Sequence, residues 1–168
     1  MRAAVVLLLL ALSPAWSLAE VGSKQVVGWV ERVRLYPGEL ELQAKIDTGA
    51  DSSSLHCTCI TPVKRDGASW VQFNVENEDG EKVRLERKVL RTVTIKRHYG
   101  EAQERMVILL GLCVGKTYRE IEVNLVDRGG FKYQLLVGRN FLAGDFLVDS
   151  SAKFLSEPYC EDAPLENE

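Results

Sequence analysis

Short segments of alternating or β-branched residues follow one another along almost the whole chain, which leaves little room for helices. Turn-forming pairs such as Pro37-Gly38 and Gly115-Lys116 separate them. The predicted strands are residues 26–33, 39–46, 69–75, 82–89, 91–96, 104–110, 118–126 and 131–137. Good helix formers follow a glycine at residues 139–143. The pattern predicts an all-β barrel or sandwich with one short helix near the C-terminus.

The first residues have the features of a secretory signal peptide. Arg2 supplies a positive charge, residues 3–12 are apolar, and small residues precede a cleavage site that we place after Ala19. The apolar run is shorter than the roughly 20 residues that a transmembrane helix needs. We therefore expect export to the periplasm, with membrane proximity only if the signal peptide, residues 1–19, stays uncleaved.

The rest of the chain has the size and composition of one globular domain. The sequence has 168 residues and 46% hydrophobic content, and we expect the domain to span residues 20–156. Residues 157–168 are acidic and contain proline, which is typical of a poorly ordered tail. The formal net charge is -3 and no basic stripe is present, so a nucleic-acid partner is disfavoured.

Export would allow disulfides among the cysteines, which are Cys57, Cys59, Cys113 and Cys160. On a strand, Cys57 and Cys59 would share one face, so we expect each to bond a distant cysteine or to stay a free core thiol. A zinc site is the alternative. It is disfavoured because no matching second pair follows, and His56 and His98 are the only histidines.

An Asp-Thr-Gly triplet interrupts the strand pattern. The strand at residues 39–46 ends directly before Asp47, which Thr48 and Gly49 follow, although Asp and Gly are poor strand formers. One interpretation is an ordinary turn. The other is an aspartic-peptidase loop, in which glycine lets the substrate approach the carboxylate closely. The triplet alone does not decide between them.

A second segment favours the peptidase loop. LQAKIDTGADSSSLH at residues 42–56 and LLVGRNFL at residues 135–142 together resemble the retropepsin-like aspartic peptidases. GWVERVRL at residues 28–35, WVQF at residues 70–73 and LLVGRNFLAGDFLVD, which begins at Leu135, are similar to a bacterial retropepsin-like family labelled ATP-dependent zinc protease. This resemblance extends over most of the mature chain. It implies a retropepsin-like β-barrel that assembles as a homodimer.

The label of that family makes two claims that the residues do not support. The paired histidines and glutamate of a zinc-protease helix are absent from the sequence. GLCVGKT at residues 111–117 is one residue short of a phosphate-binding loop and lies between predicted strands, so we predict a β-turn there. We therefore expect neither a metal nor a nucleotide cofactor.

The resemblance implies a mechanism that needs two chains. Aspartic peptidases use two carboxylates that share one proton, one acting as general base on a water and the other as general acid. The sequence contains one Asp-Thr-Gly. Each subunit of a homodimer would therefore contribute its Asp47 as the catalytic residue, across a twofold axis.

The same resemblance implies roles for the neighbouring residues. Thr48 would hydrogen-bond across the dimer, and the backbone of Gly49 would contact the substrate. Ala50 and Asp51 would line the cleft. Arg139 would pair with Asp51 and support the loop in a bidentate geometry that lysine cannot copy.

Retropepsin-like enzymes cover the cleft with a β-hairpin flap, for which residues 91–110 are the candidate. The substrate-binding residues near its tip would be His98, Tyr99 and Gly100, with a plain exposed hairpin as the alternative and His98 as a solvated loop residue. We expect His56 to be packed or hydrogen-bonded instead of catalytic.

The sequence thus predicts an exported homodimeric aspartic endopeptidase that acts on a peptide or protein substrate. A catalytically inactive peptide-binding module of the cell envelope is the main alternative. An envelope structural protein is a third hypothesis.

Overall fold

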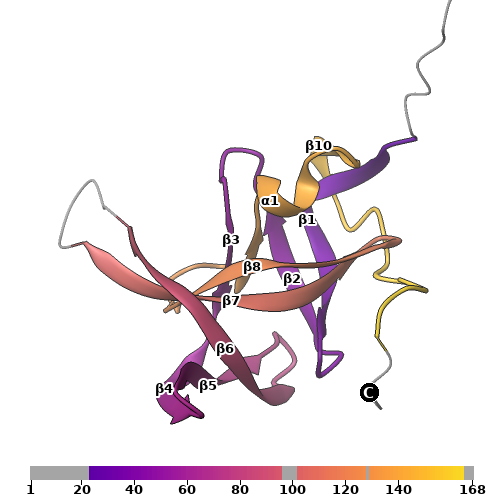
Figure 1. Ribbon diagram of the computed structural model, residues 1–168. Helices are drawn as coiled ribbons and strands as arrows, with labels where there is room; N and C mark the ends of the chain where they lie inside the picture. Colours follow the sequence, from indigo (N-terminus) through magenta and orange to yellow (C-terminus); the bar gives the residue numbers. More distant parts are fainter. Residues whose placement is uncertain (1–22, 96–101, 128, 165–168) are drawn as a thin grey trace, which may run out of the picture.

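The computed structural model describes residues 23–95, 102–127 and 129–164 (Figure 1). These residues form β1 (Gln25–Tyr36), β2 (Glu41–Ile46), β3 (Ser53–His56), β4 (Thr58–Arg65), β5 (Ala68–Glu76), β6 (Lys82–Ile95), β7 (Gln103–Val114), β8 (Thr117–Val126), β9 (Leu135–Val137), α1 (Arg139–Leu142) and β10 (Phe146–Lys153). The predicted all-β fold with one short helix is confirmed. Within the described ranges, no helix has the length and apolar character needed to cross a membrane.

The centre of the molecule is a closed barrel. Its strands follow the order β1, β2, β9, β3, β8 and β7, and pairing of β1 with β7 closes the ring. The short strands β2 and β9 run parallel, and so do β3 and β8. These parallel pairs bring the ends of β2 and β9 together, which places the segments that follow them side by side.

Alternating side chains fill the barrel. On β2, Leu42, Ala44 and Ile46 are buried while Lys45 between them is exposed. The same alternation in the other strands completes one core, whose largest fully buried members are Phe73, Phe141, Leu35, Leu42, Leu55, Ile108, Leu110, Leu112 and Leu135. Each such side chain contributes about 1.5–3 kcal/mol by leaving water. The barrel is therefore a rigid support for the loops at its rim.

A second layer extends from the barrel. The last part of β6 pairs with β7, whereas its first part pairs with β5, which in turn pairs with the exposed edge strand β4. Figure 1 shows β4, β5 and this first part of β6 projecting away from the barrel. An irregularity between Val89 and Arg91 separates the two halves of β6. The two strands predicted at this point are therefore one continuous, bent strand.

Four strands differ from the sequence-based expectation. β3, β4 and β10 were not predicted, and the strand predicted for residues 131–137 is reduced to β9. β3 lacks an apolar pattern because two of its buried side chains are the serines Ser53 and Ser54. β4 lacks a buried face altogether and contains Pro62. Both strands form because neighbouring strands supply their hydrogen-bond partners.

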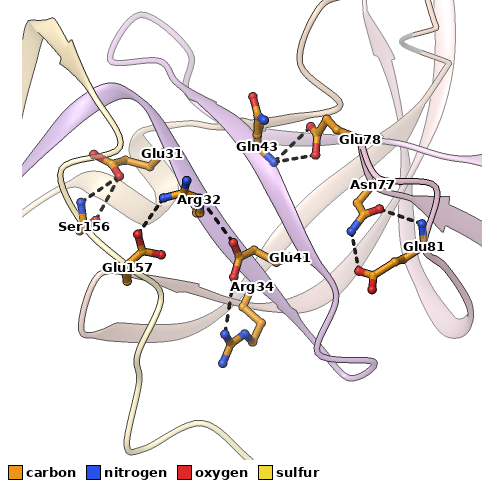
Figure 2. A network of polar contacts seen from close by, with 10 residues as sticks. All are labelled: Glu31, Arg32, Arg34, Glu41, Gln43, Asn77, Glu78, Glu81, Ser156 and Glu157. Atoms are coloured by element: carbon orange, nitrogen blue, oxygen red, sulfur yellow. Dashed lines mark hydrogen bonds and ion pairs between the residues drawn. The ribbon is translucent and has the colours of Figure 1, made fainter.

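The segment after β10 is held against the barrel by β1. The carboxylate of Glu31 is fully buried and accepts hydrogen bonds from the N–H groups of Leu155 and Ser156. Figure 2 shows the contact of Glu31 with Ser156, and beside it Arg32 between the carboxylates of Glu41 and Glu157. Buried carboxylates need such donors, so this part of β1 fixes where the chain leaves the sheet.

Two of the four cysteines form a disulfide and the other two are free. Cys113 at the end of β7 forms a disulfide with Cys160, which ties part of the acidic segment 157–164 to the barrel. Cys57 and Cys59 are both free, so the expectation that each bonds a distant cysteine is wrong, and a free core thiol is found at Cys57. Cys59 lies in β4 at a φ of 53°, where the pairing with β5 is irregular, and it is exposed whereas Cys57 is buried.

Candidate active site

Asp47 is the first residue after β2, and its backbone is fixed by the neighbouring strand β9. Its N–H donates to the carbonyl of Val137 at 2.9 Å, and its carbonyl accepts from the N–H of Ala50 at 3.2 Å. The carboxylate stands at the start of a tight loop, with 23% of its side-chain surface exposed. The strand therefore presents Asp47 at the barrel rim, where its carboxylate is partly accessible to solvent.

Both carboxylate oxygens of Asp47 have donors. The N–H of Gly49 donates to Oδ1 at 3.0 Å, and Nζ of Lys45 donates to Oδ2 at 3.0 Å. Burial raises the pKa of Asp47, but the hydrogen bonds and positive charge of Lys45 and the amides of Gly49 and Ala50 outweigh it, so the pKa is lowered. In the single chain this carboxylate is therefore ionised at neutral pH.

Arg139, the first residue of α1, connects the helix to the Asp47 loop. Its Nη1 donates to the carbonyl of Thr48 at 2.8 Å, and its Nη2 forms an ion pair with Asp51. Its backbone N–H donates to the carbonyl of Ala50 at 2.8 Å. One residue thus supports the loop at three points, two of them through the planar guanidinium.

Gly138 lets the start of α1 and the Asp47 loop approach each other. A Cβ atom at this position would lie 2.7 Å from the carbonyl carbon and oxygen of Ser52, and 3.0 Å from the carbonyl oxygen of Ala50. These are backbone atoms that a side chain cannot push aside without moving the loop. The glycine of the LLVGRNFL segment is therefore needed for the close packing of α1 on the loop.

A partly buried polar network behind the loop was missed in the sequence. Ser53 Oγ donates to Asn140 Oδ1 at 2.8 Å and accepts from the N–H of Gly138 at 3.0 Å. Asn124 Nδ2 donates to the carbonyl of Ser53 at 2.7 Å, and Arg105 Nη1 donates to Asn124 Oδ1 at 3.0 Å. The network links β7, β8, β3 and α1. The available signal was a polar residue at a buried position of a strand, Asn124 between Val123 and Leu125.

The tip of the loop is exposed. Thr48, Gly49 and Asp51 face solvent, and Ala50 is half-buried. A small cavity of about 130 Å³ lies next to the loop. Its walls are Ser52, Arg91, Val93, Ile95, Val107, Glu122 and Asn124. The cavity is therefore formed by Ser52 at the end of the loop together with β6, β7 and β8.

The hairpin expected to form the flap is present as β6 and β7, with Val93 opposite Arg105 and Ile95 opposite Gln103. The expected substrate contacts His98, Tyr99 and Gly100 lie outside the described residues. The base of the hairpin is joined to β8 by an ion pair between Arg91 and Glu122.

The remaining candidates for chemistry lie elsewhere. Nδ1 of His56 is 3.7 Å from Asp127 Oδ1. The His56 side chain is largely buried, and it lies at the end of β3 that is away from the Asp47 loop. GLCVGKT includes the β7–β8 hairpin turn at Gly115 and Lys116, so the predicted β-turn is confirmed. Across the described ranges, no group of three or more His, Cys, Asp or Glu side chains is placed to hold a metal ion.

The barrel, the Asp47 loop and the supporting Gly138-Arg139 segment define a retropepsin-like fold with a single Asp-Thr-Gly loop per chain. The family model described as "Retropepsin-like aspartic endopeptidase RimB" matches residues 26–158, and the chain belongs to this RimB-like family. A solved structure of a protein of unknown function, Lpg0085 from Legionella pneumophila, has a TM-score of 0.69 and 34% identity, covering 80% of this chain and 100% of that one.

Two curated relatives carry a different name. The "Probable alpha-L-glutamate ligase" proteins of Shewanella pealeana and Shewanella halifaxensis are each 35% identical over 116 residues, which is 67% of this chain. The match spans about a quarter of the length of these relatives, 25% in both. The comparisons do not confirm the label ATP-dependent zinc protease.

Proposed function

We propose that this protein is an aspartic endopeptidase that acts as a homodimer. The observation that carries the proposal is the Asp47 carboxylate at the barrel rim, followed by Gly49 and held by Arg139 through the loop. The family description supports the same chemistry. The exposed tip of the loop is the surface through which a second chain would bring its own Asp47.

In the proposed reaction, the two Asp47 carboxylates share one proton. The ionised carboxylate takes a proton from a water molecule, whose oxygen attacks the carbonyl carbon of the scissile peptide bond. The protonated carboxylate donates its proton to the carbonyl oxygen. Collapse of the tetrahedral intermediate breaks the C–N bond, and a proton transferred to the nitrogen completes the leaving amine. Thr48, Ala50 and Asp51 would position the loop and line the cleft.

The proposed location is the periplasm. The disulfide between Cys113 and Cys160 supports it, because disulfides form and persist in oxidising compartments. Residues 1–19 supply the proposed export signal.

We do not transfer the ligase name to this chain, because the match spans only about a quarter of those relatives. A peptidase and a glutamate ligase nevertheless act on the same kind of bond, in opposite directions. Peptides with consecutive glutamates therefore belong in the substrate panel.

The test is cleavage of a diverse peptide library by the mature protein, with mass spectrometry of the products. We expect cleavage that a pepstatin-like inhibitor reduces and that Asp47→Asn abolishes. Asp149→Asn is the matched control, because Asp149 Oδ1 accepts the N–H of Ser151 just as Asp47 Oδ1 accepts that of Gly49. Cleavage by Asp47→Asn at the parent rate would contradict the aspartic mechanism. Binding of peptides without cleavage would favour the inactive binding module.

A further inference from the structure

Lys45 lies beside Asp47 on the outer face of the barrel. Lys45 is the penultimate residue of β2 and Asp47 follows the strand directly, so the two residues are one position apart and their side chains point to the same side. The ammonium group is 3.0 Å from Asp47 Oδ2, and 46% of the Lys45 side chain is exposed. Because Gly49 holds Oδ1, the two oxygens of the carboxylate have separate donors. The orientation of the carboxylate is thus fixed at both ends.

The other charged groups around the loop are engaged elsewhere. The guanidinium of Arg139 on α1 bonds the Thr48 carbonyl and the Asp51 carboxylate. From β9, Val137 offers its backbone carbonyl to the Asp47 N–H. Within the described ranges, the charged side chain that bonds the Asp47 carboxylate is therefore Lys45, with the amides of Gly49 and Ala50 as additional electrostatic support.

We propose that Lys45 is a positioning residue of the peptidase site, whose ammonium group orients and neutralises Asp47 and so sets the pH window in which the paired carboxylates share one proton. This inference rests on the proposed function. It adds a residue outside the Asp-Thr-Gly triplet to the site and assigns it a measurable effect. Two Lys45 ammonium groups, one from each chain, would accompany each pair of carboxylates.

The direction of the effect follows from the charges. A cation within hydrogen-bonding distance favours the ionised carboxylate, so each of the two proton losses of the pair occurs at a lower pH. The reaction needs the singly protonated pair, which exists between these two losses. Lys45 therefore moves both limbs of the pH–rate profile toward acid. Its removal moves both limbs toward neutral pH.

The experiment compares the parent with Lys45→Met and Lys45→Arg. Lys45→Met removes the charge and keeps most of the side-chain length, whereas Lys45→Arg keeps the charge. Lys82→Met is the matched control, since Lys82 also forms a 3.0 Å ion pair on a strand surface, with Glu76. The first readout is the NMR titration of the Asp47 side-chain carboxyl carbon. The second is kcat/KM against pH on a cleaved peptide.

We expect Lys45→Met to raise the pKa of Asp47 and to move both limbs of the rate profile toward neutral pH. Lys45→Arg and Lys82→Met should keep the parent values. An unchanged Asp47 titration in Lys45→Met would overturn the proposal, whether or not the protein cleaves peptides. A shifted titration with unshifted rate limbs would overturn the role of Lys45 in the reaction. A shifted titration in a protein that cleaves no peptide would overturn the proposed function and leave Lys45 as the counter-ion of Asp47.

Discussion

At the scale of single residues, few side chains hold the Asp47 loop in place, and Arg139 is one of them. Arg139 uses two separate nitrogens for two acceptors, the Thr48 carbonyl and the Asp51 carboxylate. Lysine has one charged nitrogen on a flexible stem and cannot reproduce this fork. Because half of the Arg139 side chain is exposed, its effect on stability is small, and its main role is to restrict the loop.

We therefore expect Arg139→Lys to lower kcat/KM by roughly tenfold or more, with little change in the melting temperature. Arg32→Lys is the control, since Arg32 also bridges two acceptors, the carboxylates of Glu41 and Glu157, on a different part of the barrel (Figure 2). Kinetics and thermal unfolding of both variants make the comparison. Equal activity in Arg139→Lys and the parent would show that the fork does not position the loop.

The two free cysteines differ in burial, which their spacing in the sequence did not predict. Burial raises the pKa of the Cys57 thiol to about 12, and the charge of Asp127 adds to this effect, whereas a hydrogen bond from the backbone of Val126 opposes it. Cys59 is exposed. Cys57 therefore stays protonated at neutral pH and should not react.

Treatment of the native protein with a disulfide reagent such as DTNB at pH 8 should modify one thiol rapidly. The second thiol should react only after unfolding in guanidinium. In Cys59→Ser the rapid phase should disappear. Rapid reaction of two thiols in the native parent would contradict the burial of Cys57.

At the scale of elements, the site is built where β2 and β9 end side by side. The family resemblance carried by Asp47-Thr48-Gly49 and Gly138-Arg139 was sufficient to predict the contact between Arg139 and the loop. It was not sufficient for β3. This strand buries Ser53 through hydrogen bonds to Gly138 and Asn140, and such pairing depends on residues about 85 positions away. Local patterns cannot reveal contacts of that kind.

The closeness of α1 to the loop leads to a prediction for Gly138. Gly138→Ala should force Cβ against the Ser52 carbonyl and displace the loop or the helix, at a cost of about 1–3 kcal/mol. Activity should fall further than stability, because the displaced segment carries Arg139. Urea unfolding and kcat/KM measure the two effects.

Gly130→Ala is the control for this substitution, because a Cβ atom there would meet nothing within 4 Å. It should leave both stability and activity close to the parent values. Parent-like activity of Gly138→Ala would show that the loop tolerates a shift of its support.

At the scale of the whole molecule, closure of the barrel fixes the position of the site. The C-terminal segment is attached to the barrel by separate contacts. The spacing of predicted strands indicated a barrel, and pairing of β1 with β7 provides the closure. The fastening by Glu31 and by the disulfide from Cys113 to Cys160 was not predictable. A lone acidic residue in a strand and four cysteines with three connectivities do not specify partners.

The whole molecule also determines whether one chain is enough for catalysis. Each chain contains one Asp-Thr-Gly, so a site with two carboxylates needs two chains. Mixing the parent with excess Asp47→Asn tests this directly, after dissociation and reassociation of the chains. With about nine mutant chains per parent chain, random pairing leaves roughly one parent chain in ten with a parent partner.

We therefore expect the activity per parent chain to fall about tenfold in the mixture, while the same excess of an unrelated protein leaves it unchanged. The fall has a single cause, because Asp47→Asn keeps the size of the side chain and removes only the group that must share the proton. Sedimentation of the mixture should show that the chains remain paired. Constant activity per parent chain in reassociated dimers would mean that each Asp47 acts alone, and the two-carboxylate mechanism would then be wrong.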